Sequence, residues 1–407
     1  MSAAAQDERI CRERFSRFPW TIKVWSDRHR PLILGQGQPH WYRQALEIHL
    51  HSKAAYQDFV KMNAWGLVQR FLRGEIDVEG NYYLLASIKA YVPVRLSLLQ
   101  VLGHFLQNHL FQTIDRAQLS VKSHYDISQS LLEKYLDVRY MAYSCAMFKD
   151  VELSEQCLQD LRRPGQGQVD DYDSLEQAQW RKYKDAVDFI SPQSGESLLD
   201  VGCGYGGQLQ VALENHPFGK VVGWTHSSNQ VTYGSRWLDT FSDRQWELNE
   251  GDYRQDDRVY DHITSTGMIS HVGPRGLKPY IRNIRRRIHT GGRYVHHALM
   301  AHYNPVPLDR QVGIAFNKRY VWPGFHWFTL GEHIRLLERN GFKVLKVQNL
   351  RDQYSKTITA WYERFMANRE LMQLEMGDQT FRAWRLYLGG GAGPLSGDVN
   401  RIYCVAV

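Results

Sequence analysis

A strand that runs directly into a glycine-rich turn constrains this 407-residue chain more than any other feature. Leu198 to Gly207 reads LLDVGCGYGG, a compact apolar run followed by closely spaced glycines. Glycine lets the backbone approach a ligand closely and point amide groups at it. The segment also satisfies GxGxxG, a dinucleotide-binding pattern, and the bland alternative is a strand-to-helix turn without a ligand. We expect a nucleotide-like cofactor here.

The next predicted strand, Lys220 to Trp224, argues against a dinucleotide. A dinucleotide site has an acidic residue about 20 positions after the glycines, at the end of this strand, to bind the ribose hydroxyls. The strand instead continues into VVGWTHSSNQ, where Thr225 and Gln230 are polar but uncharged. The missing acidic residue therefore argues against a nicotinamide dinucleotide and leaves a different nucleotide-like cofactor.

Two regions of the chain differ in their predicted elements. From about residue 186 strands alternate with helices, which predicts an α/β unit with a mostly parallel sheet. Residues 20–115 combine short strands with a helical stretch, Ala54 to Arg73, and predict a small α+β unit. We expect an N-terminal domain over residues 1–115 and a second domain over 116–407. The polar segment Gln156 to Asp173 is expected to be a loop.

Composition narrows the class of protein. No apolar stretch approaches the roughly 18 residues that a membrane helix needs. Residues 1–14 lack the apolar run of a signal peptide, so we expect a cytoplasmic location. Five scattered cysteines without a CxxC pair predict free thiols and no metal site.

The formal charge of +7 favours an anionic partner, which charge alone does not identify. The densest basic run is Arg275 to Arg293. A solvated helix face and a patch for lipid headgroups fit this run equally well.

Seven separated motifs, the glycine turn among them, resemble the cyclopropane fatty acid and mycolic acid cyclopropane synthases over roughly residues 20–400. Besides LLDVGCGYGG and VVGWTHSSNQ, they are HYDI at 124–127, LDVRYMAYSCAMF at 136–148, SLEQAQWRK at 174–182, GMISHVGP at 267–274 and QYSKTITAWYERF at 353–365. The N-terminal FLRGEIDV is similar to an extra domain of the bacterial enzymes. The resemblance implies a Rossmann-like class I methyltransferase domain. Its implied activity is C-methylation of the double bond of an unsaturated lipid acyl chain by S-adenosylmethionine.

The resemblance also implies a set of cofactor-binding residues. In that family the cofactor is held by the YSC segment, the glycine turn, the end of the second strand and a GDY segment. In this chain these positions are Tyr143, Ser144, Gly202, Gly204, Thr225, His226, Gln230, Asp252 and Tyr253. Taken alone, Tyr143 is more typical of a core aromatic and Ser144 of a turn hydroxyl.

The family's base is a bicarbonate ion, held by a cysteine amide, a glutamate, a histidine, a backbone amide and a tyrosine. Cys145, His297, the amide of Leu299 and Tyr354 match four of these five. The family's GMFEHVGP reads GMISHVGP here, which places Ser270 at the glutamate position. A serine has neither the charge nor the reach of a carboxylate, so proton relay through this position is lost.

Three hypotheses follow for the chemistry at Ser270. Methyl transfer to an alkene leaves a carbocation, which must lose a proton to close a ring. In the first hypothesis a neighbouring group such as His271, His296 or a water replaces the glutamate; in the second the carbocation loses a proton elsewhere and gives a methyl or methylene branch. In the third the domain binds cofactor or lipid without turnover. His296 and His297 are adjacent on a predicted strand, so only one of them can face the site.

The chain also has a cluster of aromatic residues after position 320, and its motifs leave two rival functions open. Trp322, Phe325, Trp327 and Phe328 either line an acyl pocket or pack in the core. A small-amine methyltransferase is one rival, since plant alkaloid N-methyltransferases resemble the same domain, although the N-terminal unit argues against it. A non-catalytic membrane-associated scaffold is the other, although the intact cofactor residues argue against that.

The resemblance finally implies partners for this chain. They are unsaturated phospholipid acyl chains at an anionic membrane surface, with peripheral association at the inner membrane face and no nucleic acid. A homodimer is expected because the resembling bacterial enzymes form one.

Overall fold

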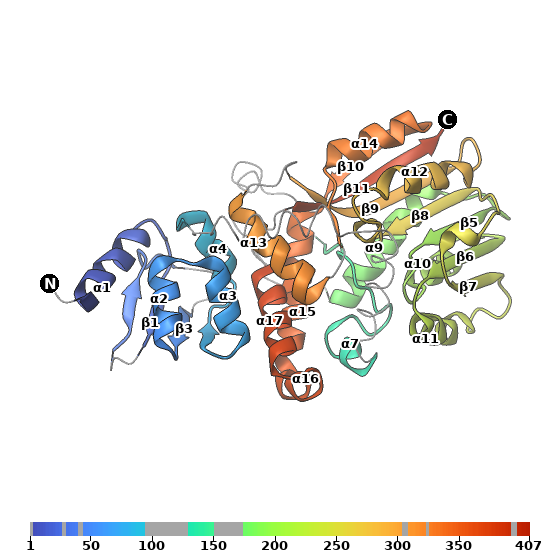
Figure 1. Cartoon of the computed structure of the whole chain (residues 1–407). Coiled ribbons are helices and arrows are strands. Elements are labelled where there is room, and N and C mark those ends of the chain that lie inside the picture. Colours follow the sequence, from blue (N-terminus) through green and yellow to red (C-terminus); the bar gives the residue numbers. More distant parts are fainter. Residues whose placement is uncertain are drawn as a thin grey trace.

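The computed structural model describes residues 3–26, 30–39, 44–93, 129–149, 174–302, 308–322, 325–391 and 397–407. These residues form a small N-terminal unit and a larger unit built on a seven-stranded sheet (Figure 1). Helices α13 (Leu308–Phe316) and α17 (Asp378–Gly391) lie between the two. The predicted boundary at residue 115, the HYDI motif, the predicted loop at 156–173 and Cys157 lie outside the described residues.

The N-terminal unit has a four-stranded sheet in the order β2-β1-β3-β4. Strand β1 pairs antiparallel with β2 and parallel with β3, which pairs antiparallel with β4. The elements are α1 (Ala3–Arg14), β1 (Ile22–Trp25), β2 (Leu32–Leu34), β3 (Leu46–Leu50), α2 (Lys53–Lys61), α3 (Ala64–Leu72), β4 (Ile76–Gly80) and α4 (Leu84–Tyr91). A sheet covered by helices confirms the predicted small α+β unit.

The single helix predicted over Ala54 to Arg73 is wrong, because the structure divides it into α2 and α3. Met62 ends α2 with a left-handed φ of 53°. Asn63 then caps α3, since its side chain accepts a hydrogen bond from the Gly66 amide at 3.2 Å. The apolar spacing is helical on both sides of this break, so periodicity alone did not reveal it.

The larger sheet has the order β10-β11-β9-β8-β5-β6-β7. Strands β5 to β9 run parallel, and β11 lies antiparallel between β9 and β10. The strands are β5 (Ser197–Val201), β6 (Lys220–Thr225), β7 (Trp246–Glu250), β8 (His262–Thr266), β9 (Arg293–Ala301), β10 (Phe342–Asn349) and β11 (Gly397–Ala406). This confirms the predicted α/β unit with a mostly parallel sheet.

Helices cover both faces of this sheet. The neighbours Leu198 and Leu199 of β5 enter different hydrophobic clusters, because successive strand residues point to opposite faces. The helices are α7 (Gln129–Tyr135), α9 (Leu175–Ile190), α10 (Gly207–Asn215), α11 (Ser228–Leu238), α12 (Leu277–Arg286), α14 (Leu330–Arg339), α15 (Arg351–Ala367) and α16 (Arg369–Met376). None of the helices in the described ranges is long and apolar enough to cross a membrane.

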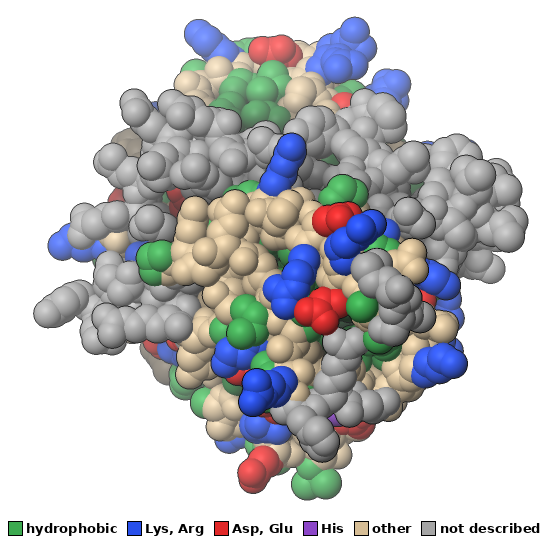
Figure 2. All heavy atoms as spheres, turned by 90° about the vertical axis from the view of Figure 1, so that its left-hand side faces the viewer, with side chains coloured by type: hydrophobic (Ala, Val, Ile, Leu, Met, Phe, Trp, Pro, Cys, Tyr) green, Lys and Arg blue, Asp and Glu red, His purple; other side chains and the backbone are tan. Residues whose placement is uncertain are grey.

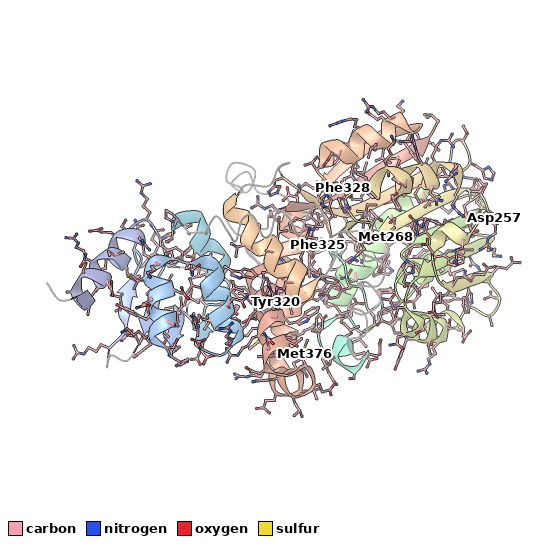
Figure 3. All side chains as sticks on the ribbon, in the orientation of Figure 1. Asp257, Met268, Tyr320, Phe325, Phe328 and Met376 are labelled. Atoms are coloured by element: carbon pink, nitrogen blue, oxygen red, sulfur yellow. The ribbon has the colours of Figure 1, made fainter. Side chains whose placement is uncertain are left out.

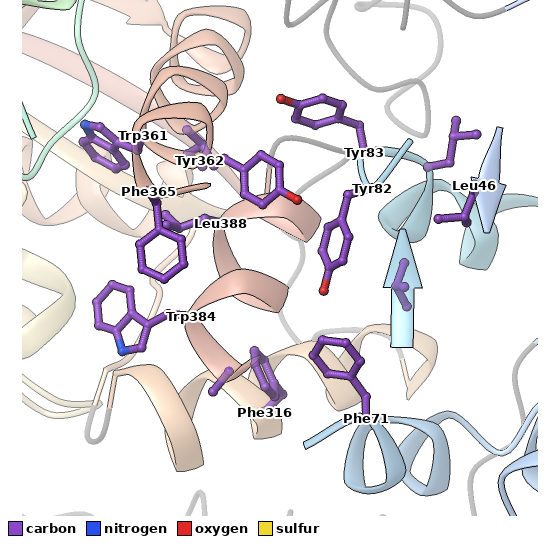
Figure 4. Close-up of a cluster of buried hydrophobic side chains, with 14 of the residues drawn as sticks. Leu46, Phe71, Tyr82, Tyr83, Phe316, Trp361, Tyr362, Phe365, Trp384 and Leu388 are labelled. Carbon is purple, nitrogen blue, oxygen red and sulfur yellow. The ribbon is translucent and has the colours of Figure 1, made fainter. Parts of the chain in front are cut away.

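The core of the N-terminal unit continues into the larger unit. Phe71 and Tyr82 belong to the same buried cluster as Phe316, Trp361 and Leu388 (Figure 4). The ring centroids of Tyr82 and Tyr362 are 5.6 Å apart. The shared apolar contacts hold the two units together and set the position of the cavity described below.

Candidate functional site

A cavity of about 170 Å³ opens at the carboxyl ends of β5, β6 and β8, and we call it the glycine-turn cavity. In open α/β sheets, ligands bind beyond the carboxyl ends of the strands. All nine residues predicted to bind the cofactor line it: Tyr143, Ser144, Gly202, Gly204, Thr225, His226, Gln230, Asp252 and Tyr253. The structure therefore brings together segments that span more than 100 residues of sequence.

Backbone conformation explains the glycines of the turn. Gly202 and Gly204 have φ angles of 75° and 56°, which side chains other than glycine rarely adopt. A Cβ atom on Gly202 would lie 2.6 Å from the Met268 side chain. A Cβ atom on Gly204 would meet nothing within 4 Å. The backbone thus leaves open space at Gly204, which fits a ligand that lies against the turn.

Polar groups surround the opposite side of the glycine-turn cavity. The Thr225 hydroxyl donates to the side-chain oxygen of Gln230 at the end of β6. Asp252 accepts a hydrogen bond from the Arg254 amide at 2.9 Å and pairs with the Arg254 guanidinium. Burial tends to raise the pKa of Asp252, but the hydrogen bonds from Arg254 outweigh it and lower the pKa. The carboxylate is therefore charged and can accept hydrogen bonds from a sugar.

Sequence reasoning missed Asp200, which also lines this cavity. Asp200 ends the LLD run directly before the glycine turn, and that position was the available signal. It accepts a hydrogen bond from the Thr264 hydroxyl at 2.8 Å. Burial raises its pKa to about 7. A cation bound nearby would favour the charged form.

A buried lysine supports the Tyr143–Cys145 segment, and sequence reasoning assigned it no role. The ammonium group of Lys182 donates to Ser144 Oγ and to Gln179 Oε1, both at 2.7 Å. The Gln179 amide donates to the Ser144 carbonyl at 3.0 Å. Burial lowers the pKa of Lys182. Both supporting residues lie in the SLEQAQWRK motif, which was the available signal.

A second cavity of about 400 Å³ adjoins the first, and we call it the apolar cavity. The two cavities share four lining residues: Tyr143, Ser144, Gly267 and His271. All five residues predicted to be catalytic line the apolar cavity: Cys145, Ser270, His297, Leu299 and Tyr354. Among the described residues, no aspartate, glutamate, lysine or arginine lines it.

The aromatic segment after α13 contributes to the apolar cavity. Trp322, Phe325 and Trp327 line it, whereas Phe328 packs in the core beside the sheet. Figure 3 shows Phe325 near α13, with Met268 on the side of the sheet. The segment is thus divided, because three of its aromatic residues line the apolar cavity and one packs in the core.

The ring of His297 is held in one protonation state. Its Nδ1 atom accepts hydrogen bonds from the buried Arg401 guanidinium at 3.2 Å. Burial, with the charge of Arg401, holds the pKa of His297 well below its usual range. The neutral ring then carries its proton on Nε2, because Nδ1 is the acceptor. Sequence reasoning missed Arg401, for which no motif gave a signal.

His296 faces the other side of β9 and does not line the apolar cavity. Its Nδ1 atom lies 2.7 Å from the Tyr294 hydroxyl, and its Nε2 atom lies 3.0 Å from Nδ1 of His333. The ring is fully buried. The structure therefore makes His296 a core residue with hydrogen-bond partners.

Ser270 and His271 lie in a short turn that follows β8, Ile269–His271. The Ser270 carbonyl accepts a hydrogen bond from the His326 amide at 2.7 Å. Burial lowers the pKa of His271 to about 4, so its ring is neutral near pH 7. Within the described part of the chain, the ring nitrogens have no hydrogen-bond partner. His271 is therefore an uncharged base on the wall between the two cavities.

The remaining predicted catalytic groups are hydrogen-bond donors. Burial raises the pKa of the Cys145 thiol to about 12, so the thiol stays protonated. Burial also raises the pKa of Tyr354, which keeps its hydroxyl protonated. Leu299 lies on β9 beyond His297, the last β9 residue that pairs with β8. The Cys145 thiol donates to the Ala146 carbonyl at 3.3 Å. The backbone amides of Cys145 and Leu299, the Tyr354 hydroxyl and His297 Nε2 fit a small anion, but no carboxylate among the described residues of this wall can take its proton.

Comparisons with known proteins agree with this geometry. The family model described as mycolic acid cyclopropane synthetase matches residues 112–403. A probable fatty acid methyltransferase of Pseudomonas putida is 31% identical over 279 residues, which cover 67% of this chain. This chain spans 64% of the length of that relative, which is less than two thirds.

Two further proteins match over different extents. The cyclopropane-fatty-acyl-phospholipid synthase of Escherichia coli K12 is 25% identical over 353 residues, 85% of this chain and 84% of that protein. The crystal structure of mycolic acid cyclopropane synthase CmaA1 with SAH and CTAB is 25% identical, with a TM-score of 0.60. The match covers 71% of this chain and 98% of the CmaA1 chain.

The seven-stranded sheet, with its antiparallel strand between β9 and β10, defines a class I methyltransferase fold. Within this class, the chain belongs to the mycolic acid cyclopropane synthetase family.

Proposed function

We propose that this protein is an S-adenosylmethionine-dependent C-methyltransferase that acts on the double bond of an unsaturated phospholipid acyl chain. The observation that carries the proposal is the wall shared by the two cavities, formed by Tyr143, Ser144, Gly267 and His271. A cavity whose polar groups fit a nucleoside thus adjoins one that fits a hydrocarbon. Bound S-adenosylmethionine supplies an electrophilic methyl group.

The apolar cavity suits a carbocation on the lipid. A methyl group added to an alkene leaves a positive charge on the neighbouring carbon. Aromatic faces stabilise a cation, and the rings of Tyr143, Trp322 and Phe325 line the cavity. Exclusion of water prevents capture of the cation as an alcohol. The cation must then lose a proton, either from the new methyl group to close a ring or elsewhere to give a methyl or methylene branch.

A proton acceptor must complete this chemistry. Bicarbonate held by Cys145, His297, Leu299 and Tyr354 would supply a base, as the family resemblance implies. Ser270 supplies no carboxylate to relay its proton. The core position of His296 and its two hydrogen-bond partners argue against it as the acceptor. His271 remains the neutral side chain on the shared wall that accepts a proton directly.

Membrane association is part of the proposal. Helix α12 buries Leu277, Ile281 and Ile284 and exposes Lys278, Arg282 and Arg286. An exposed basic helix face attracts anionic lipids. This supports peripheral docking on an anionic membrane, from which the acyl chain enters. A homodimer remains a prediction from the family resemblance.

The direct test incubates the purified protein with methyl-labelled S-adenosylmethionine and vesicles of unsaturated, partly anionic phospholipid. Label in the fatty acids, identified by mass spectrometry, is the expected result. Small amines are added to the same assay as a second acceptor. Label that appears only in these amines would favour an N-methyltransferase. Cofactor binding without transfer to either acceptor would favour a scaffold.

A variant tests the role of Ser270 in the same assay. We expect Ser270→Glu to raise the share of cyclopropane product, because a carboxylate restores the proton relay beside the anion-binding donors. Ser270→Gln has a similar size without the charge and is the matched control. An unchanged product mixture in Ser270→Glu would show that this position does not control the product.

A further inference from the structure

The apolar cavity does not end at the catalytic groups but continues into the N-terminal unit. Helix α3 lines it with Ala64, Leu67, Val68 and Phe71. These positions follow an i, i+3, i+4, i+7 pattern and form one face of the helix. Residues of β3 and β4 line the cavity opposite this face. The cavity therefore reaches between the sheet and the helices of the small unit.

The two ends of the cavity differ in chemistry. The end at the sheet carries hydroxyl and imidazole groups, from Ser270, His271, His297 and Tyr354. Every described residue of the N-terminal unit that lines the cavity is apolar. An apolar lining favours hydrocarbon and cannot satisfy a glycerol or phosphate group. This end therefore suits an acyl tail and excludes a headgroup.

The N-terminal end of the cavity is bounded by core residues. Ile48, Phe59 and Val78 are each at most 5% exposed. In Figure 2 the described part of the outer face carries scattered charged side chains, and its hydrophobic side chains form small separate groups. A methyl end can stop within a core, whereas a phospholipid headgroup needs a path to water.

The join between the two units keeps the cavity continuous. Gln69 of α3 donates a hydrogen bond to the Tyr320 hydroxyl at 2.9 Å, and Tyr320 lies where the two units meet (Figure 3). Arg382 of α17 pairs with Asp77 of β4 at 2.8 Å. An empty apolar cavity would cost stability, because its lining loses packing contacts. Hydrocarbon that fills it restores these contacts.

We propose that the N-terminal unit binds the methyl-terminal part of the acyl chain and so measures the distance from the double bond to the methyl end. This inference rests on the proposed function, which places the double bond at the shared wall. The carboxyl end and headgroup then leave the cavity on the other side of the catalytic groups. The N-terminal unit is thus a specificity element for double-bond position.

Three acyl chains separate this orientation from the reverse one. Oleoyl has two more methylenes than palmitoleoyl on the methyl side of the double bond, whereas cis-vaccenoyl has two more on the carboxyl side. The assay offers phospholipids of all three in mixed vesicles to the full-length protein with labelled S-adenosylmethionine. Each product is quantified by mass spectrometry.

We expect Ala64→Phe, which fills the cavity beside α3, to lower the use of oleoyl about tenfold relative to palmitoleoyl, since two methylenes lose their apolar site. Cis-vaccenoyl should follow palmitoleoyl. Phe71→Leu, which enlarges the cavity, should shift use toward oleoyl and tests the proposal if Ala64→Phe does not fold. Gln57→Phe places the same aromatic side chain at an exposed position of α2 and should keep the wild-type ratios.

The outcomes distinguish failure of the acyl-tail site from failure of the methyltransferase activity. Selective loss of cis-vaccenoyl in Ala64→Phe would reverse the orientation and overturn the proposal. Equal loss of all three chains, with unchanged cofactor affinity, would also overturn it, while leaving the proposed function intact. Absence of label in every lipid with the wild-type protein would instead refute the proposed function.

Discussion

The glycine-turn cavity is lined by short contiguous segments, whereas the apolar cavity is assembled from elements of both units. In the first, Gly202 and Gly204 have positive φ angles, which the glycine spacing in the sequence predicts. In the second, the α3 face meets residues of α13 and α17 that lie more than 200 positions away. The glycine-turn cavity is therefore built within one unit from segments that each carry a sequence motif, whereas the apolar cavity depends on how the two units pack.

The largest effect should come from the locally specified cavity. Gly202→Val places a β-branched residue at a φ of 75° with its Cβ 2.6 Å from Met268. We expect S-adenosylmethionine affinity to fall on the order of 1000-fold. Isothermal titration calorimetry measures it.

Gly331→Ala is the matched control, because its Cβ meets nothing within 4 Å. It should bind the cofactor as the wild type does. Near-wild-type affinity in Gly202→Val would mean that the turn does not position the ligand.

A smaller effect is expected at the wall that the two cavities share. If His271 accepts the proton, His271→Asn should lower product formation about 100-fold, the usual contribution of a positioned base. The change should appear in kcat, with cofactor affinity changed only a few-fold. Single-turnover assays with labelled cofactor measure this step.

The pH profile provides a second readout for His271. Burial lowers its pKa to about 4, so the ring remains a neutral base above that pH. Wild-type kcat should therefore not fall between pH 8 and pH 6 through this group. An unchanged rate in His271→Asn would exclude His271 and return the role to a bound anion or water.

The smallest effect concerns stability. Burial lowers the pKa of His271 to about 4 and that of His296 to about 3, both below the ordinary histidine pKa of about 6.5. Between pH 6.5 and these lowered pKa values, the histidines of the unfolded chain bind protons that those of the folded chain do not. The free energy of unfolding should therefore fall as the pH drops from about 6.5 toward 4. Each histidine contributes up to about 1.4 kcal/mol per pH unit.

Denaturant titrations at pH 7, 6 and 5 measure this slope. His271→Asn should flatten it by the share of one histidine. A slope that stays the same in the variant would show that His271 does not titrate with the depressed pKa.

Sequence reasoning reached the α/β class, the strands around the glycine turn and the residues that line both cavities. The class and the strands followed from local properties, namely the alternation of strands and helices and the glycine spacing, whereas the cavity residues came from the resemblance to the cyclopropane synthases. It missed Arg401 and the break at Met62, since each depends on a contact or a backbone angle that no periodicity records. Asp200 lies in the LLDVGCGYGG motif and Lys182 in the SLEQAQWRK motif, but only the structure shows the buried hydrogen bonds that they form.

The sequence by itself determined the glycine turn, the mostly parallel sheet and the serine at position 270, because these are written in adjacent residues. Tertiary structure decided which of two neighbouring histidines faces the apolar cavity and where that cavity leads. The pleat of β9 turns His297 toward the cavity and His296 into the core. The packing of α3 against α13 extends the cavity into the N-terminal unit, and packing between distant segments is set only when the whole chain has folded.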